Sequence, residues 1–384
     1  MSSESSPVAE SLGIVQEHTY TFGPPGEPII LENGRAFGPI DVRYETYGNL
    51  NAERSNAVLI LHAFTGDAHA AGFHTAESKH PGWWNDMVGP GKPFDTNKYF
   101  VICSNVLGGC RGTTGPGSMD PETGKPFGLS FPVITIRDMV NVQKRLVDHL
   151  GIQRLLAVAG GSMGGMQALE WSVAYPEMVA SSIVLASTAR LTAQGIAFNA
   201  VGRNAIMSDP HFQSGNYYSD QMPAQGLSIA RMVGHITYLS DESMGMKFGR
   251  KLQERAAYGF DFADQFQVES YLEYQGDKFV DRFDANSYIY LSKAMDYYDL
   301  GERYGGLDFA ASRITGKVLV ISFTSDWLYP PYQAKEVVFA LMKAEKDVSY
   351  TELNSPYGHD SFLLETKRQG RLISSFLGSV YGHD

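Results

Sequence analysis

The sequence predicts an α/β protein with a mostly parallel sheet, helices on both faces and an inserted helical lid. Short, nearly all-apolar runs alternate with helical patterns, which is typical of parallel strands covered by helices on both faces. The strand pattern disappears from about Thr188 to Gly306 and resumes at Lys317, so a helical segment interrupts the sheet. With 384 residues, 43% of them hydrophobic and 19% charged, the chain can bury the core that this architecture needs.

The expected elements follow one another in the order that such a sheet requires. Two opening strands, Thr19–Phe22 and Ile40–Tyr47, are separated by a Gly- and Pro-rich turn at residues 23–28. The apolar runs that should form the buried strands are Ala57–His62, Tyr99–Ser104, Arg154–Gly160, Ser181–Ala186 and Lys317–Phe323. Helical patterns lie between these runs, most clearly at Ile136–Leu150 and Gly165–Tyr175.

These patterns divide the chain into three segments. Residues 1–187 and 307–384 are expected to form the two parts of the core, and residues 188–306 are expected to form the lid. The lid segment is rich in Met, Tyr and charged residues and is interrupted by Gly and Asp-Pro. Its helices should cover the carboxyl ends of the strands, where sheets of this kind bind ligands.

Charge and cysteine content limit the partners and the compartment. The formal net charge of −11 argues against nucleic acid or an anionic membrane as a partner, although a local basic pocket for one phosphate-bearing molecule remains compatible with it. The two cysteines, Cys103 and Cys110, indicate a reducing compartment or indifference to disulfides. Residues 1–17 do not have the pattern of a signal peptide, and no apolar run approaches about 20 residues, so a cytoplasmic location is expected. We expect no bound metal and no permanently bound cofactor.

A serine between glycines is the strongest local motif. The segment Gly160–Gly164 places Ser162 between an apolar strand and the start of a helix. A serine on such a sharp turn projects its hydroxyl from the sheet, and small neighbours are needed because the backbones crowd there. The same pattern could instead cradle a phosphate or allow close packing. Its position after a buried strand favours Ser162 as a nucleophile.

A serine nucleophile needs a base and a carboxylate, and both follow later in the chain. Asp326 lies just beyond the strand at 318–323, and His359 follows the expected strand at 348–353. Alone, an aspartate in this place is usually a helix cap and a single histidine is usually structural. The chain order Ser162, Asp326, His359 is nevertheless the order of the α/β-hydrolase fold.

The oxyanion of a tetrahedral intermediate needs backbone N–H donors. One donor should be the amide of Met163, directly after the nucleophile, and the other should come from the loop 62–67. We favour the amide of Phe64 for the second donor, with Ala63 as the alternative. His62 competes with His359 for the role of base, but its place at the end of an early strand indicates that it shapes the loop. His235 lies in the lid segment and is interpreted as structural.

The chain resembles the homoserine O-acetyltransferase family along nearly its whole length. The motifs that carry the resemblance are Tyr44–Gly48, Leu61–Asp67, Asn105–Cys110, Gly112–Pro116, Gly161–Gln167, Ala230–Ser240 and Tyr357–Asp360. The resemblance implies Ser162, Asp326 and His359 as the catalytic triad, and Arg231 and Asp360 as contacts of the amino-acid substrate. A guanidinium suits the carboxylate of homoserine and an aspartate suits its ammonium group. Without the surrounding match, Arg231 would be interpreted as part of a salt bridge within the lid.

The resemblance also implies a mechanism and a biological role. The acetyl group of acetyl-CoA would pass to Ser162 and then to the hydroxyl of L-homoserine, a ping-pong reaction in methionine biosynthesis. A lid would exclude water, which would otherwise hydrolyse the acyl-enzyme. A homodimer through the lid helices is expected from the family and not from the composition or spacing of this chain.

Several alternatives remain open at this stage. The same triad with an open pocket would be an esterase or a thioesterase, and a degenerate triad would leave a binding protein. The donor could be succinyl-CoA, and the acceptor could be serine, because one methylene group gives only about 1 to 3 kcal/mol of discrimination. The CoA-contacting residues cannot be assigned from the sequence.

Overall fold

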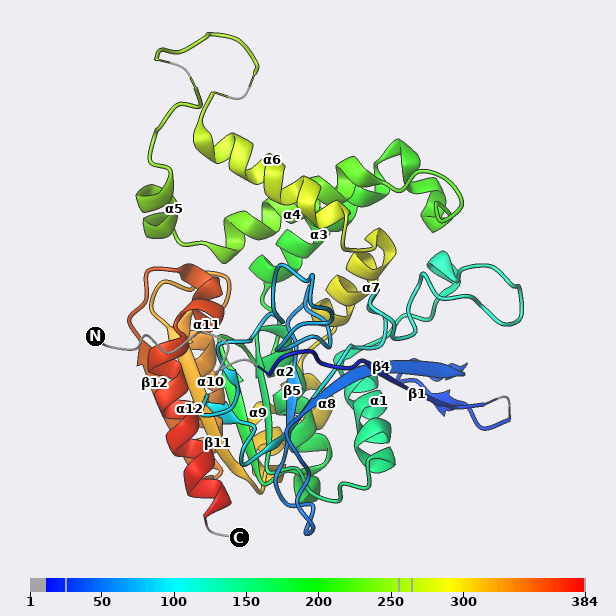
Figure 1. Ribbon diagram of the computed structural model, residues 1–384, viewed down its shortest axis with the longest axis vertical. Coiled ribbons are helices and arrows are strands. Elements are labelled where there is room, and N and C mark those ends of the chain that lie inside the picture. Colours follow the sequence, from blue (N-terminus) through cyan, green and yellow to red (C-terminus); the bar gives the residue numbers. More distant parts are fainter. Residues whose placement is uncertain (1–11, 25, 255, 264, 383–384) are drawn as a thin grey trace.

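An eight-stranded sheet forms the centre of the computed structural model, which describes residues 12–24, 26–254, 256–263 and 265–382. The strand order is β1-β4-β8-β5-β9-β10-β11-β12. The pairs β1/β4 and β4/β8 are antiparallel, and every pair from β8 to β12 is parallel. The sheet is therefore mostly parallel, and β4, next to the edge strand β1, is the strand that runs in the opposite direction (Figure 1).

The elements have the following bounds. The sheet strands are β1 (His18–Phe22), β4 (Ile40–Tyr47), β5 (Ala57–Leu61), β8 (Phe100–Ser104), β9 (Ala157–Gly161), β10 (Ser181–Leu185), β11 (Lys317–Phe323) and β12 (Val348–Leu353). Two small strand pairs are β2 (Ile29–Ile30) with β3 (Ala36–Phe37) and β6 (Val88–Gly89) with β7 (Phe94–Asp95). The helices are α1 (Ile136–His149), α2 (Met163–Ala174), α3 (Ala193–Met207), α4 (Ala224–Tyr238), α5 (Asp241–Lys247), α6 (Gln267–Val280), α7 (Ala285–Asp296), α8 (Leu300–Tyr304), α9 (Leu307–Arg313), α10 (Pro331–Lys343), α11 (Ser361–Leu364) and α12 (Thr366–Tyr381).

The all-apolar strands supply both faces of the sheet because successive side chains of a strand point to opposite sides. In β5, Leu59 and Leu61 join the core that packs against α1, α2 and α10, while Val58 and Ile60 join the core that packs against α12. All five residues of β5 are buried. This two-sided burial explains why the central strands show no polar alternation in the sequence.

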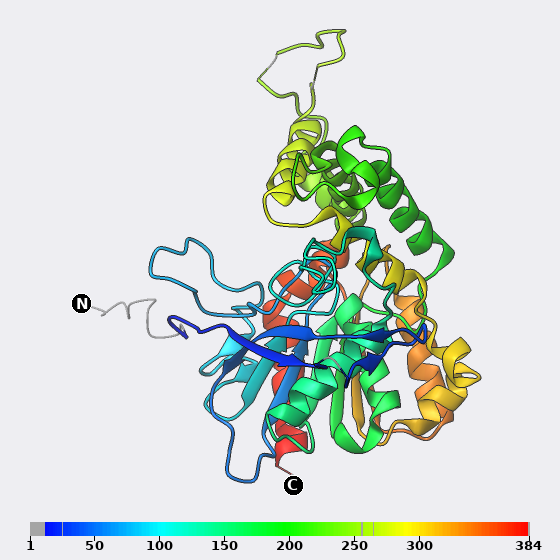
Figure 2. The ribbon, with the colours of Figure 1, turned by 90° about the vertical axis from the view of Figure 1, so that its right-hand side faces the viewer.

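The helices between β10 and β11 gather beyond one end of the sheet. Figures 1 and 2 show α4, α5 and α6 stacked there, away from the chain end marked C. Helix α4 packs against both α3 and α6. Helices α8 and α9 return to the body of the protein, where the Tyr304 hydroxyl donates to Glu170 of α2 at 2.9 Å. The three-segment division of the chain stays a prediction, since α8 belongs to the expected lid by sequence but contacts the core.

Most expected elements are present, with shifted ends. The strand expected at Arg154–Gly160 begins only at Ala157, and the helix expected from Gly165 begins at Met163, directly after the candidate nucleophile. Within the described residues, none of the helices is both long enough and apolar enough to cross a bilayer. Residues 1–11 of the segment tested for a signal peptide, and one residue of the turn at 23–28, lie outside the described residues.

Candidate active site

Ser162 occupies a strained turn between β9 and α2. Its backbone has φ 58° and ψ −125°, a conformation that is uncommon for a residue with a side chain. The turn is possible because its neighbours lack side chains. A Cβ atom on Gly164 would lie 2.0 Å from the Leu61 carbonyl oxygen, and one on Gly160 would lie 2.4 Å from the backbone of Gly164. The glycines therefore let β9 and α2 approach closely enough to present Ser162.

We expect Gly164→Ala to destabilise the protein by about 1 to 3 kcal/mol or more, because the added methyl group meets backbone that cannot rotate away. The free energy of unfolding in urea measures the effect. Gly245→Ala in α5 is the matched control: its Cβ would meet no atom within 4 Å, so the change should be neutral or slightly stabilising. Equal stability of the two variants would contradict the close approach.

His359 and Asp326 form a buried pair. The ring Nδ1 of His359 lies 2.8 Å from Oδ2 of Asp326, and the two side chains are 3% and 0% exposed. The other carboxylate oxygen, Oδ1, accepts from the backbone amides of Leu328 and Tyr329 at 3.1 and 2.8 Å. Asp326 is therefore fixed on both sides, an arrangement that favours the tautomer of His359 with its proton on Nδ1.

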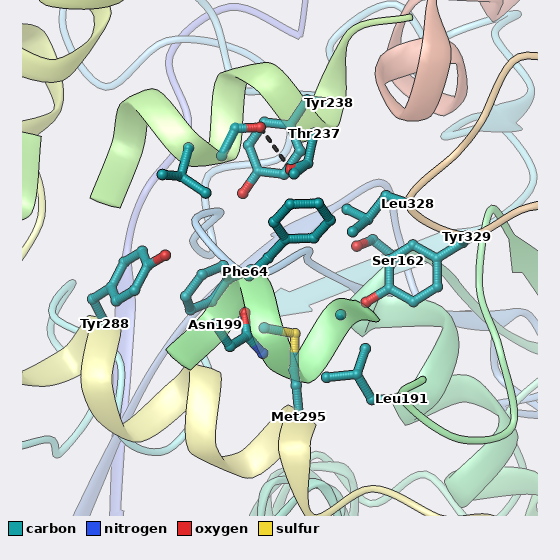
Figure 3. A pocket seen from close by; sticks show the side chains of 14 residues that line it. Phe64, Ser162, Leu191, Asn199, Thr237, Tyr238, Tyr288, Met295, Leu328 and Tyr329 are labelled. Atoms are coloured by element: carbon teal, nitrogen blue, oxygen red, sulfur yellow. Dashed lines mark hydrogen bonds between the residues drawn. The ribbon is translucent and has the colours of Figure 1, made fainter. Parts of the chain in front are cut away.

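Tyr329 connects this pair to the nucleophile. Its ring centroid lies 5.0 Å from that of His359. Burial raises the pKa of the Tyr329 hydroxyl, and a hydrogen bond with Ser162 partly offsets the shift. Figure 3 shows Tyr329 beside Ser162 in the same cavity. In the described part of the chain, no hydrogen bond joins the Ser162 hydroxyl to His359, and such contacts commonly tighten only when substrate binds.

Two backbone amides near Ser162 have no acceptor. Within the described residues, neither the Phe64 nor the Met163 N–H donates a hydrogen bond. Both belong to the segments in which oxyanion donors were expected. His62 is occupied elsewhere: Nδ1 lies 2.8 Å from the Ala63 carbonyl oxygen, and Nε2 accepts from the Val106 amide at 3.1 Å. Because burial also lowers its pKa, His62 is suited to holding the loop rather than to acting as the base.

Arg231 and Asp360 bring opposite charges to this site without pairing to each other. In the described chain no carboxylate lies within 4.0 Å of Arg231; its Nη1 donates to the Thr65 hydroxyl at 3.3 Å, and its buried Nε has no partner. Asp360 directly follows His359 in the short 3-10 turn Gly358–Asp360. Burial raises the pKa of Asp360, while His359 and Arg231 act in the opposite direction. The two groups are thus available to a ligand that carries both charges.

The cavity next to Ser162 is small and mostly apolar. It is lined on one side by Phe64 of the loop 62–67, and on the helical side by residues such as Met295 of α7 and Thr237 and Tyr238 of α4 (Figure 3). Its volume is about 40 Å³, which is room for a few water molecules. The helices inserted between β10 and β11 therefore limit what can reach the nucleophile.

The structure adds residues that the sequence did not single out. Tyr329 is one, and the only available signal was its position three residues after Asp326. Arg282 is another: its Nη1 donates to the Thr65 carbonyl at 3.1 Å, and burial together with Arg231 lowers its pKa to about 10. His235 hydrogen-bonds the Tyr271 hydroxyl at 3.2 Å through Nδ1, in keeping with a structural role.

The strand order and the Ser-His-Asp arrangement define an α/β-hydrolase-fold enzyme, and the family described as alpha/beta hydrolase fold matches residues 56–366. Within that fold, the chain belongs to the homoserine O-acetyltransferase family. The homoserine O-acetyltransferase of Methanosphaerula palustris is 60% identical over 375 residues, covering 97% of this chain and 75% of that protein. The resemblance found in the sequence is therefore confirmed.

Solved structures show that the fold alone does not distinguish a transferase from an esterase. Homoserine O-acetyltransferase from Bacillus anthracis superposes with a TM-score of 0.89 at 32% identity, covering 95% of this chain and 98% of that one. Esterase E22 superposes with a TM-score of 0.87, also at 32% identity, covering 95% and 100%. Transferases and an esterase thus share this architecture, and the choice between them depends on the residues around the nucleophile.

Proposed function

We propose that this protein transfers an acetyl group from acetyl-CoA to the hydroxyl of L-homoserine, as a step of methionine biosynthesis. The observation that carries the proposal is that Arg231, which lies over the Tyr238 ring, and Asp360, which directly follows His359, are oppositely charged and form no ion pair with each other. Homoserine is a zwitterion, and its carboxylate and ammonium groups complement this pair. Its side-chain hydroxyl would then face Ser162.

The reaction proceeds in two half-reactions. In the first, His359 removes the proton of Ser162, Oγ attacks the thioester carbonyl carbon, and the C–S bond breaks as coenzyme A leaves with the proton from His359. The amides of Phe64 and Met163 stabilise the oxyanion. In the second, His359 takes the proton of the homoserine hydroxyl, whose oxygen attacks the acyl-serine, and the proton returns to Ser162. Asp326 keeps His359 in the required tautomer throughout.

Acetyl is favoured over succinyl as the transferred group because the cavity beside Ser162 is small. A second hollow is lined by residues of the loop 62–67 together with Lys278 and Arg282, among others. These two cations would suit the phosphate groups of the donor in an otherwise acidic protein. No metal and no permanently bound cofactor takes part in the proposed steps.

Water is the competing acceptor to consider, because the structurally similar protein E22 is an esterase. An esterase needs no ion-recognition groups beside its nucleophile, whereas Arg231 and Asp360 would be buried at a cost without an amino-acid substrate. Serine is the other competitor, since it carries the same charged groups on a shorter chain. The position of the acceptor hydroxyl relative to Ser162 then decides between the two amino acids.

The proposal is tested by product analysis. Purified protein is incubated with acetyl-CoA or succinyl-CoA, and with L-homoserine, L-serine or no acceptor, while free thiol is followed and products are identified by mass spectrometry. We expect rapid thiol release only with acetyl-CoA and homoserine, yielding O-acetylhomoserine. Equal release without an amino acid would make the protein a hydrolase, and a preference for succinyl-CoA or serine would change the assigned substrates.

The protonation of Asp360 should determine how KM for homoserine changes with pH on the acidic side. Because its pKa is raised by burial, it becomes protonated at higher pH than an ordinary aspartate, and a neutral carboxyl group cannot pair with the ammonium of homoserine. We expect KM for homoserine to rise as the pH falls. Asp360→Asn should raise KM about tenfold and remove this dependence, while KM for acetyl-CoA stays constant. An unchanged KM profile in the variant would exclude this role.

We also propose that the helical segment acts as a lid and forms a homodimer. Ile229 and Ile236 are 40% and 44% exposed and lie seven residues apart on α4, so they share one face of the helix. We expect two chains per particle by light scattering, and one chain after Ile229→Asp with Ile236→Asp. Phe339→Asp changes an apolar position on α10 that is 64% exposed, and it is the control that should leave the mass unchanged. A monomeric wild type would refute the dimer; the cytoplasmic location stays a prediction.

A further inference from the structure

One motif of the sequence has no part in the proposed reaction. The segment Tyr44–Gly48 lies on β4, and its Glu45 is fully buried at 0% exposure. A buried carboxylate is costly unless it is paired or coordinates an ion. No Lys or Arg side chain lies within 4.0 Å of Glu45 in the described chain, and its partners are of a different kind.

Two histidines converge on Glu45 from the segment that follows the loop 62–67. Nδ1 of His69 lies 3.0 Å from Oε2, and Nε2 of His74 lies 2.7 Å from Oε1. Their ring centroids are 3.8 Å apart. One ligand atom from each of the three side chains falls within 4.8 Å of the others. Two imidazole nitrogens and one carboxylate oxygen are therefore held around a single point.

We propose that Glu45, His69 and His74 bind one divalent transition-metal ion, with zinc the best match to these ligands. Zinc accepts two imidazoles and a carboxylate at about 2.0 to 2.2 Å, with water in the fourth position. When the ion binds, each imidazole coordinates through the nitrogen that now faces Glu45, and any proton on that nitrogen moves to the other ring nitrogen or to solvent. The two rings, whose planes are now tilted by 35° to each other, must shift so that both nitrogens face the ion.

The surroundings support such a site. The Tyr47 hydroxyl donates to Oε2 of Glu45 at 2.7 Å and accepts from the Ala70 amide at 2.8 Å, which orients the carboxylate from behind. Partners of this kind commonly fix the ligands of a metal. The side chain of His74 is 38% exposed, so an ion and its water can enter from solvent. The buried side of the site is thus rigid and the open side accessible.

Protons compete with the ion for the same nitrogens. The titratable groups that face this cluster are Glu17, Tyr47, Asp67, His69, His74 and Cys103. A nitrogen that coordinates the ion must be free of its proton, so metal affinity should increase with pH.

A bound ion would affect the position of the loop that carries Phe64. The His69 amide donates to Oδ1 of Asp67 at 3.0 Å, and the Asp67 carbonyl accepts from the Trp83 indole at 3.0 Å. A metal bound at His69 would tie the end of this loop to β4. The ion would take no part in the proposed acyl transfer, since its ligands belong to a cluster separate from Ser162, Asp326 and His359.

Metal binding to the full-length, chelator-treated protein tests the proposal. Zinc is titrated calorimetrically, and cobalt(II) is titrated in parallel while its visible absorption bands report the ligand geometry. We expect one ion per chain, tighter binding at higher pH, and a rise in melting temperature on addition of zinc. Dissociation constants are then compared for wild type, His74→Ala and Glu45→Gln, with His80→Ala as the control.

The variants His74→Ala and His80→Ala show whether the ion binds at the proposed cluster or elsewhere. His74→Ala changes an exposed side chain, so the protein should fold while its affinity falls at least about tenfold. His80→Ala removes a nearby exposed histidine outside the cluster and should bind as wild type does. Absence of stoichiometric binding in the wild type overturns the proposal. Binding that persists unchanged in His74→Ala, or that is lost equally in His80→Ala, places the ion elsewhere and also overturns it.

Discussion

Replacing Ser162 by alanine is expected to lower kcat/KM for acetyl transfer by about 10⁴- to 10⁶-fold, because the covalent intermediate can no longer form. The fold should be unaffected, since alanine fits wherever serine does. The initial rate of coenzyme A release in the presence of homoserine measures the loss, and thermal unfolding checks that the variant is intact.

A comparison with Asp326→Asn tests whether Ser162 is the nucleophile. That change keeps the shape of the side chain but favours the wrong tautomer of His359, so we expect a smaller loss, about 10⁴-fold, with the acyl-enzyme still able to form slowly. If Ser162→Ala retained more activity than Asp326→Asn, Ser162 would not be the nucleophile. Direct transfer between the two substrates would then be the better description.

Replacing Arg231 by alanine is expected to raise KM for homoserine about 10- to 100-fold. A hydrogen bond to a charged group contributes about 1.5 to 3 kcal/mol, and each 1.4 kcal/mol corresponds to a factor of ten. The guanidinium already has an unpartnered buried Nε, so the carboxylate of homoserine would gain a donor that nothing else satisfies. Steady-state rates with homoserine varied at saturating acetyl-CoA give the value.

The first half-reaction separates a substrate contact from a structural role. Arg231→Ala should acylate from acetyl-CoA at the wild-type rate and fail only in the step that needs homoserine. Arg250→Ala is the matched control, because this arginine is exposed in the same helical segment and contacts the Phe266 ring instead. A loss of acylation in Arg231→Ala would mean that Arg231 holds the lid together and does not recognise the amino acid.

The central sheet could be predicted because its strands are buried on both faces. The run at 57–61 is apolar throughout, and the runs at 181–185 and 317–323 are apolar except for two residues each, so a buried strand is the best interpretation at this length. The start of β9 was placed at Arg154, three residues early, because apolar residues lead into that strand through a turn. Element ends depend on tertiary contacts, such as those at Ser162, that a local pattern does not contain.

The catalytic triad could be predicted because its order along the chain is typical of the fold. Ser162, Asp326 and His359 each follow a strand, and parallel strands bring their ends to one edge of the sheet. Tyr329 and Arg282 were missed because their roles arise from contacts with Ser162 and Thr65 across the fold. The cluster at Glu45 was missed for the same reason: its ligands are separated by up to 29 residues and meet only when the loop 62–74 folds over β4.

The most direct test of the proposed acyl-serine mechanism is the intact mass of the protein during a single turnover. With acetyl-CoA alone, we predict one added acetyl group per chain, located on Ser162 by peptide mapping, that persists in water. Addition of L-homoserine should discharge it and yield one equivalent of O-acetylhomoserine. A protein that never becomes acylated, or whose acetyl group is lost equally fast without homoserine, would contradict the account.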